Sequence, residues 1–239
     1  MPFCAGKTAT FSPTTIAVHN AGDVYRAGTC LQIHADTLLK LATTACDNGG
    51  VGIESTLHHV LVVGGGVEQW ESLRVEEWQK YLALLRNAVE HVGAKWLTIY
   101  PHSGVTKSMS SEDLLQRIAN SVSGVVSESK VIVQGATTIV FDACADGRDR
   151  FVRAVNALGD GNIKEEKLAQ AILHPAIGEP DLVVIFGAPD QLPKSLVWEL
   201  AYSELVFLQT QWPQCNSEDI ELAINDFQRR DRRFGGVDS

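Results

Sequence analysis

Short, continuous apolar runs alternate along the chain with longer segments in which apolar residues return every three or four positions. The runs "HVLVV" (59–63), "WLTIY" (96–100) and "DLVVIFG" (181–187) are rich in β-branched and aromatic residues, which is typical of buried strands. Segment 75–92 has one apolar helical stripe, and Gly93 follows it. Strand, helix and strand in succession predict a βαβ unit with parallel strands.

The alternation continues toward the C-terminus. "SSEDLLQRIANSV" begins with a capping-box-like Ser110 and Asp113 and predicts a helix. "KVIVQG" and "TTIVFDA" are strand candidates, and "DGRDRFVRAVNAL" is an amphipathic helix candidate. The apolar segment "SLVWELAYSELVFL" follows the strand at 181–187, and 217–233 predicts a last helix. The pattern therefore predicts an α/β fold in a single domain, with a mostly parallel central sheet flanked by helices.

The first part of the chain has a weaker pattern. "ADTLLKLATTACDNGG" (35–50) predicts one helix that ends at a glycine pair. We assign residues 1–57 to an N-terminal helical or irregular segment that packs on the domain, and residues 58–239 to the α/β domain. No apolar run approaches the roughly 20 residues that span a bilayer, and the first residues lack a secretory signal pattern. We therefore expect a cytosolic chain.

Composition excludes some kinds of function. The net charge of −9 argues against a nucleic-acid scaffold, which would present a basic face. The five cysteines are scattered without a C-x-x-C pair, and the histidines lack a ligand spacing such as H-E-x-x-H. A metal site built from cysteine or histidine alone is therefore not expected.

The stretch "HVLVVGGGVEQW" (59–70) places a glycine turn directly after a strand. Such a turn can bind phosphate through its backbone amides. It is not a dinucleotide fingerprint, because Gln69 occupies the position of the third glycine. We favour a structural turn, in which the glycines let the chain bend sharply, over a phosphate-binding loop.

Three stretches together resemble the cis-prenyltransferase family, the undecaprenyl and dehydrodolichyl diphosphate synthases. Segment 59–70 resembles the family's H-V-A-x-I-M-D-G-N-x-R-W, and "GAKWLTIYPHSG" is similar to G-x-x-x-L-T-x-Y-A-F-S. Segments 180–213 and 224–237 resemble D-L-x-I-R-T-G-G-E-x-R-x-S-N-F-x-x-W-x-x-A-Y-x-E-x-x-F and the R-R-x-G-G ending. The resemblance covers about residues 58–237 and implies the family's fold and its elongation of an allylic diphosphate by isopentenyl diphosphate.

The positions that carry chemistry in the resembled family have changed. Its loop aspartate holds magnesium, its asparagine is implicated in proton loss and its arginine clamps the diphosphate; these match Gly65, Val67 and Gln69. Two arginines and a serine of its second substrate site match Ile185, Gln191 and Pro193. A hard cation needs oxygen ligands, and a diphosphate is held best by guanidinium forks. The resemblance therefore implies a degenerate site.

Other positions of the family pattern are kept. Arg233 and Gly235 match its R-x-G motif, which in the family reaches across a dimer to the neighbour's substrate diphosphate. Glu204 matches the glutamate of A-Y-x-E that lies near the metal, although a structural glutamate is an equal alternative. Gly147 and Arg148 match the G-G-R before the family's interface helix.

The local sequence is more similar to one subset of that family. "YPHSGVTK", "DGRDRFVRA" and "DLVVIFG" resemble Y-D-H-Q-G-x-x-K, D-G-K-x-D-I-V-R-A and D-L-V-L-K-F-G of the Nogo-B receptor-like accessory subunits of dehydrodolichyl diphosphate synthase. The resemblance implies a non-catalytic subunit without a cofactor of its own, whose Arg233 and Gly235 act at isopentenyl diphosphate in a partner that holds Mg²⁺.

That resemblance also implies a place in the cell. Polyprenyl diphosphate made by such a pair is the precursor of dolichol for protein glycosylation, and in a eukaryote the chain would lie at the endoplasmic reticulum membrane through its partner. Two alternatives stay open: a divergent active prenyltransferase, and a scaffold or binding protein on the same fold.

Overall fold

The computed structural model describes residues 57–159, 161–187, 189 and 191–229, together with the backbone of three short strands within residues 17–30. In these parts ten strands form one sheet in the order β3-β2-β1-β10-β9-β4-β5-β8-β7-β6. The apolar runs are its centre: β4 (His59–Val63) pairs in parallel with β5 (Trp96–Tyr100) and with β9 (Leu182–Phe186). The predicted βαβ unit is confirmed.

Parallel pairing extends outward from this centre and ends in antiparallel hairpins. β10 (Glu204–Leu208) continues the sheet beside β9, and β8 (Thr138–Phe141) continues it beside β5. β7 (Lys130–Val133) and β6 (Val125–Ser127) then run antiparallel. The mostly parallel central sheet predicted from the sequence is confirmed.

The N-terminal segment contributes strands to the other edge. β1 (Ala17–Asn20) lies parallel to β10, and β2 (Asp23–Arg26) and β3 (Thr29–Cys30) follow antiparallel. The sequence pattern did not indicate these strands. The helix expected at 35–50 lies outside the described residues, and the boundary between residues 57 and 58 stays a prediction.

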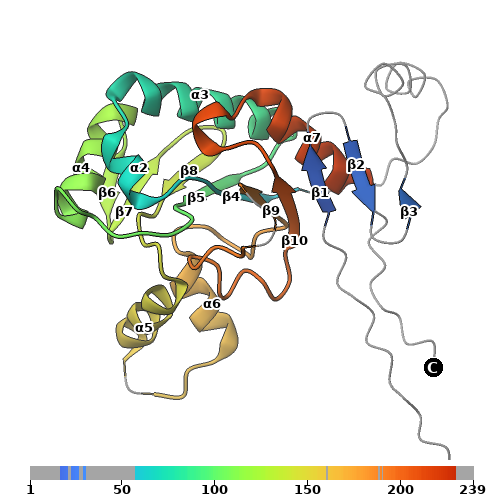
Figure 1. The fold of residues 1–239 in the computed structure, drawn as a ribbon. Coiled ribbons are helices and arrows are strands. Elements are labelled where there is room, and N and C mark those ends of the chain that lie inside the picture. Colours follow the sequence, from blue (N-terminus) through green and yellow to red (C-terminus); the bar gives the residue numbers. More distant parts are fainter. Residues whose placement is uncertain are drawn as a thin grey trace, which may run out of the picture.

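Helices cover both sides of the sheet (Figure 1). α3 (Val75–His91), α4 (Ser111–Val122) and α7 (Ser217–Arg229) bury their apolar stripes in the larger core cluster. The short α2 (Val67–Ser72) follows the glycine turn. α5 (Gly147–Leu158) and α6 (Glu165–Leu173) lie together on the other side.

Two sequence-based expectations about helices have different outcomes. The N-cap predicted for α4 is present, because the Ser110 hydroxyl accepts a hydrogen bond from the Asp113 amide at 3.1 Å. The amphipathic α5 forms as predicted, but Phe151, Val152 and Leu158 of its apolar stripe are 36–55% exposed. Its buried side consists instead of small residues and a charged residue. Among the described residues, no helix is long and apolar enough to cross a membrane.

A buried histidine in the sheet makes the stability of the fold depend on pH. His59 lies in β4 with 1% of its surface exposed, its Nδ1 3.1 Å from the Gly178 carbonyl and its Nε2 2.9 Å from the Thr98 hydroxyl. Nδ1 therefore donates to the carbonyl and Nε2 accepts from the hydroxyl, which is the neutral form. Burial lowers the pKa of His59 from 6.5 to about 4, against smaller opposing effects of the Gly178 carbonyl and Asp181.

Between these two pKa values the unfolded chain binds a proton at His59 and the folded chain does not. The free energy of unfolding should therefore fall by up to about 1.4 kcal/mol per pH unit as the pH drops from 6.5 toward 4. Urea denaturation at several pH values measures this slope. His59→Gln should make the slope shallower, and replacement of the exposed His91 by glutamine should leave it unchanged. Equal slopes for wild type and His59→Gln would contradict the assignment.

Candidate functional site

The glycine turn after β4 is closed by contacts within the protein. The Gly64 amide donates to the Tyr100 carbonyl at 3.1 Å, and the Val67 amide donates to the Ser103 carbonyl at 2.9 Å. The Gly66 amide donates to Gln69 Oε1 at 3.0 Å. Three of the amides that could have faced a phosphate therefore already have acceptors, which supports a structural turn over a phosphate-binding loop.

The remaining contacts of the turn fix its shape. Trp70 Nε1 donates to the Gly64 carbonyl at 2.8 Å, and the His102 amide donates to the Gly65 carbonyl. Gly65 has a φ of +69°, which favours glycine because a side chain is strained there. The turn thus joins the carboxyl ends of β4 and β5.

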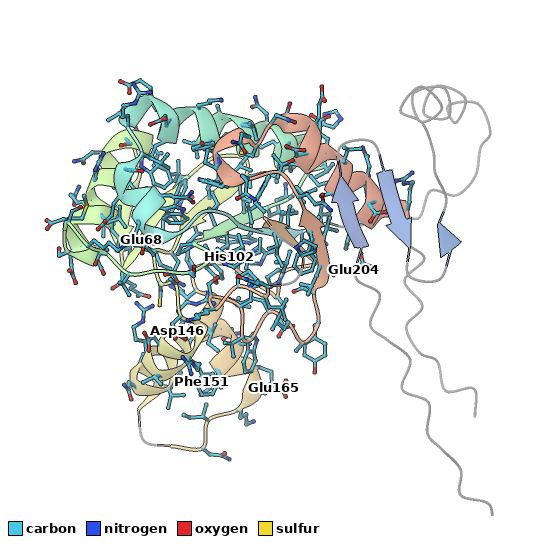
Figure 2. The ribbon with its side chains drawn as sticks, viewed as in Figure 1. Glu68, His102, Asp146, Phe151, Glu165 and Glu204 are labelled. Atoms are coloured by element: carbon cyan, nitrogen blue, oxygen red, sulfur yellow. The ribbon has the colours of Figure 1, made fainter. Side chains whose placement is uncertain are left out.

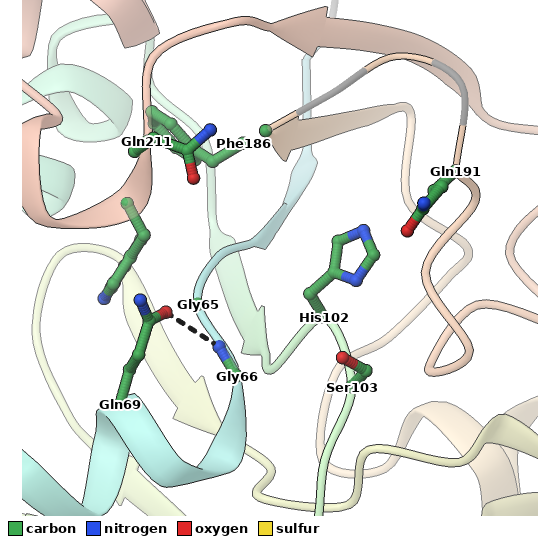
Figure 3. Close-up of a pocket in the computed structure, with 10 residues that line it drawn as sticks. Gly65, Gly66, Gln69, His102, Ser103, Phe186, Gln191 and Gln211 are labelled. Atoms are coloured by element: carbon green, nitrogen blue, oxygen red, sulfur yellow. Dashed lines mark hydrogen bonds between the residues drawn. The ribbon is translucent and has the colours of Figure 1, made fainter.

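A cavity of about 260 Å³ lies at this edge of the sheet (Figure 3). Its lining comes from the segments after β4, β5, β9 and β10, whose carboxyl ends meet here because the strands are parallel. The residues that line it are Gly65, Gly66, Gln69, His102, Ser103, Phe186, Gly187, Gln191, Gln211 and Trp212. The cavity therefore occupies the usual position of a ligand site in an open parallel sheet.

Three of the six substituted positions predicted from the sequence meet in this cavity. Gly65 and Gln69 enter it from the glycine turn and α2, and Gln191 enters it from the segment after β9. Gln69 and Gln191 are 122 residues apart in the sequence. The structure therefore brings positions matched to the family's phosphate loop and to its second substrate site into one cavity.

The other three positions are buried away from that lining. Val67 is 2% exposed and belongs to the larger core cluster. Ile185 is fully buried in β9, opposite Val63 and Phe207, in the smaller core cluster on the other face of the sheet. Pro193 is also buried, and its carbonyl accepts from the Leu196 amide at 3.1 Å. Ile185 therefore serves packing where the resembled family has a charged ligand.

Glu204 lies far from the cavity. It is the first residue of β10, where its amide donates to the Asp181 carbonyl at 3.0 Å. The cavity lies past the other end of this five-residue strand, and each residue adds roughly 3.3 Å. Figure 2 shows Glu204 apart from His102. The structure does not bring Glu204 to the cavity, so a metal role there has no support.

Arg233 and Gly235 lie beyond the end of α7, outside the described residues. The described part of α7 ends at Arg229, whose guanidinium is 4.0 Å from Asp226. Their predicted role in a partner subunit stays a prediction.

Six lining residues had no site role assigned from the sequence, namely His102, Ser103, Phe186, Gly187, Gln211 and Trp212. All lie at or after the carboxyl ends of strands, and that position alone could have indicated them. Trp212 could be placed in the lining only from the structure, because it begins a 3-10 turn (Trp212–Gln214) that follows β10.

The lining chemistry does not fit a metal–diphosphate complex. The described lining residues offer amides, a hydroxyl and an imidazole, but no carboxylate for magnesium and no guanidinium for phosphate. Within the described part of the chain, no group of three or more histidine, cysteine, aspartate or glutamate residues could hold a metal ion. This cavity can supply neutral hydrogen bonds and aromatic surface.

The indole of Trp212 fills the space above the glycine turn. Trp212 is 2% exposed, with ring centroids 4.8 Å from Tyr81 and 5.7 Å from Phe186. A Cβ atom on Gly64 would lie 2.0 Å from Trp212 Cε3. Gly64 is therefore required by close packing against this ring.

Gly64→Ala should destabilise the fold by about 1–3 kcal/mol, because the added methyl group overpacks the core. Urea denaturation followed by tryptophan fluorescence measures the change. Gly161→Ala is the matched control, since apart from its chain neighbours no described heavy atom lies within 4 Å of a Cβ placed there. A Gly64→Ala variant as stable as the Gly161→Ala variant would contradict this account of the turn.

Comparison with known families matches residues 105–235, more than half of the chain, to the family described as putative undecaprenyl diphosphate synthase. The glycine turn lies outside the matched residues. Aquifex aeolicus isoprenyl transferase is 27% identical over 189 residues, covering 77% of this chain and 79% of that protein.

Other relatives match over a shorter region. Lactococcus lactis isoprenyl transferase is 35% identical over 100 residues, 38% of this chain and 41% of that protein. The Escherichia coli ditrans,polycis-undecaprenyl-diphosphate synthase ((2E,6E)-farnesyl-diphosphate specific) is 32% identical over 124 residues, 47% of this chain and 49% of that enzyme. These two matches span less than half the length of the relatives.

Two solved structures share the fold. Lavandulyl diphosphate synthase from Lavandula x intermedia, in complex with dimethylallyl diphosphate, has a TM-score of 0.54 at 16% identity and covers 74% of this chain and 98% of its own. A probable undecaprenyl diphosphate synthase from Campylobacter jejuni has a TM-score of 0.51 at 18% identity, covering 75% and 98%. With the family match over residues 105–235, the chain belongs to the undecaprenyl diphosphate synthase family of cis-prenyltransferases.

Proposed function

We propose that this chain is a non-catalytic, Nogo-B receptor-like accessory subunit of a heteromeric cis-prenyltransferase that makes polyprenyl diphosphate. The observation that carries the proposal is the lining of the cavity. Gly65, Gln69 and Gln191 lie there together, at positions where the family motifs have an aspartate and two arginines. These substitutions would remove the metal ligand and the two arginines that clamp the diphosphates in the family motifs. Both substrates would therefore bind weakly at this one site.

The part this chain would play in catalysis lies in its tail. Arg233 and the backbone amide of Gly235 would reach the isopentenyl diphosphate in a catalytic partner of the same family. A guanidinium binds phosphate oxygens bidentately, and an amide adds a fixed donor, so the contribution is electrostatic and positional. The partner would supply Mg²⁺ and both substrate sites.

The product would be the precursor of dolichol for protein glycosylation. In a eukaryotic cell the chain would then lie at the endoplasmic reticulum membrane through its partner. No nucleic acid is involved in this proposal, in keeping with the net charge of −9.

Two other functions are compatible with the fold. The matched relatives are named as enzymes, which favours a divergent active prenyltransferase that binds its substrates differently. A scaffold or binding protein that kept only the fold is the other.

One pair of assays separates the three functions. The purified chain is incubated with Mg²⁺, farnesyl diphosphate and radiolabelled isopentenyl diphosphate, first alone and then with a co-expressed catalytic homologue. We expect no elongation by the chain alone, and faster elongation by the pair than by the homologue alone. Elongation by the chain alone would establish the divergent enzyme. Co-purification of the pair without any change in the partner's turnover would support the scaffold function.

A further inference from the structure

The cavity beside the glycine turn, which we call the glycine-turn cavity, is lined by polar side chains that carry no formal charge. Its described lining holds three carboxamides, one hydroxyl and one imidazole. They come from the four segments that follow β4, β5, β9 and β10. Polar groups from separate parts of the chain therefore converge on one space, which is typical of a binding site.

The Gln69 side chain is held in place and directs its donors toward the cavity. Its Oε1 accepts from the Gly66 amide at 3.0 Å, which fixes the orientation of the carboxamide (Figure 3). Its Nε2 donates to no other described residue. A ligand oxygen can therefore accept from Nε2 without displacing an existing contact.

The other four polar side chains of the lining are also uncommitted. His102, Ser103, Gln191 and Gln211 make no side-chain hydrogen bond to another described residue. All four are partly or fully exposed, so their polar atoms are accessible from the cavity. In the view of Figure 3, His102 and Gln191 lie on one side of the space, and Gln69 and Gln211 lie on the other.

The lining disfavours two other classes of ligand. It has no described lysine or arginine for an anion, and Glu68 beside the turn is paired with Lys107 at 3.4 Å. A nucleobase is commonly held by stacking on an open aromatic face. Phe186 and Trp212 expose only 3% and 2% of their surface, so neither offers such a face.

Hydroxyl groups suit this lining better. A carboxamide both donates and accepts, as a hydroxyl does. Carboxamides that approach from different segments match hydroxyls that radiate from a ring. The cavity of about 260 Å³ lies just below the roughly 300–1,000 Å³ of ordinary ligand pockets, so it holds a ligand of one small ring.

We propose that the glycine-turn cavity binds a small uncharged polyol, such as a cyclitol or a monosaccharide. One ring hydroxyl accepts from Gln69 Nε2, and others exchange hydrogen bonds with His102, Gln191 and Gln211. The inference rests on the proposed function in one respect, namely that no diphosphate occupies this cavity. It goes beyond that function by assigning a neutral ligand to the chain itself.

Isothermal titration of the full chain, without a partner, tests the proposal. myo-Inositol and D-glucose are the polyol probes, and at least one should bind with a dissociation constant on the order of 1 mM, as is usual for so few atoms. Cyclohexanol has the ring of myo-inositol with a single hydroxyl and should bind at least tenfold more weakly. Adenine should give no measurable binding. The proposal is wrong if neither polyol binds, if cyclohexanol binds as tightly as the polyol, or if adenine binds in its place.

Isopentenyl diphosphate with Mg²⁺ is a further probe that tests the proposed function separately. We expect no binding by the chain alone. Binding that competes with the polyol would contradict both the non-catalytic function and the polyol site. Absence of polyol binding, with no binding of the diphosphate either, would contradict the polyol site and leave the proposed function standing.

Two variants on opposite sides of the space locate the polyol. Gln191→Leu and Gln211→Leu each remove a carboxamide at an exposed position and should weaken binding about three- to tenfold. The matched control is Gln214→Leu, because Gln214 is exposed, lies three residues after Gln211 and is outside the lining. Circular dichroism checks that each variant is folded. Undiminished binding by both Gln191→Leu and Gln211→Leu, or an equal loss in Gln214→Leu, would overturn the assignment.

Discussion

Arg233→Ala is expected to lower the turnover of the co-expressed pair by about 10- to 100-fold. The proposed role of Arg233 is a charge-assisted contact to a diphosphate, and such contacts contribute about 1.5–3 kcal/mol. If the contact forms only as the reaction proceeds, kcat falls; if it also binds the ground state, KM rises as well. Steady-state kinetics with varied isopentenyl diphosphate measure both parameters.

The matched control for Arg233→Ala is Arg229→Ala. Arg229 is the last residue of α7, is half exposed and lies 4.0 Å from Asp226. It precedes the R-x-G motif by four positions and should leave turnover unchanged. Equal rates for wild type and Arg233→Ala, with the pair still co-purifying, would show that the tail takes no part in catalysis. That result would favour the scaffold function. Arg233→Lys should recover only part of the rate, because an ammonium lacks the guanidinium fork.

The sequence predicted the centre of the fold well because burial on two faces leaves a clear signal. β4, β5 and β9 are continuous apolar runs, and the stripes of α3 and α7 repeat at helical spacing. The edges were less predictable. β10 shares the segment 195–208 with irregular turns, so its period was not evident. α6 was not predicted; it is only nine residues long, and four of them are polar.

The candidate site was predictable in its location but not in its details. The family motifs indicated Gly65, Gln69 and Gln191, and these meet in one cavity. The motifs could not indicate that Ile185 packs on the other face of β9, since that depends on strand register and side-chain direction. Nor could they indicate that the amides of the glycine turn are already occupied.

The buried charges beside Tyr100 were also beyond sequence analysis. Arg150 belongs to the α5 stretch that was taken as an ordinary amphipathic helix, and Glu199 to an apolar segment. The structure buries both, with side chains 3% and 0% exposed, and pairs them at 3.1 Å. This ion pair links α5 to the segment after β9, where Gln191 lies. Its loss should therefore affect both the fold and the shape of the glycine-turn cavity.

Arg150→Met is expected to destabilise the protein by about 3–5 kcal/mol. The substitution keeps most of the side-chain volume but leaves the Glu199 carboxylate buried without its counter-charge. It also removes the guanidinium N–H that donates to the Ser195 carbonyl. Urea denaturation of the full chain measures the loss. The exposed pair of Arg148 with Asp146 supplies the matched control, and Arg148→Met should leave the denaturation midpoint where it is.

The double variant Arg150→Met/Glu199→Leu decides why the single variant is unstable. If the cost comes from the uncompensated charge, removal of both charges should restore most of the lost stability, because an apolar pair of similar volume can replace a buried ion pair. If the cost comes from the stacking of the guanidinium on Tyr100 or from the Ser195 contact, the double variant should stay as unstable as Arg150→Met. A single variant as stable as wild type would show that the pair contributes nothing to the fold. The coupling energy from this cycle thus measures how firmly α5 is fixed to the segment that shapes the cavity.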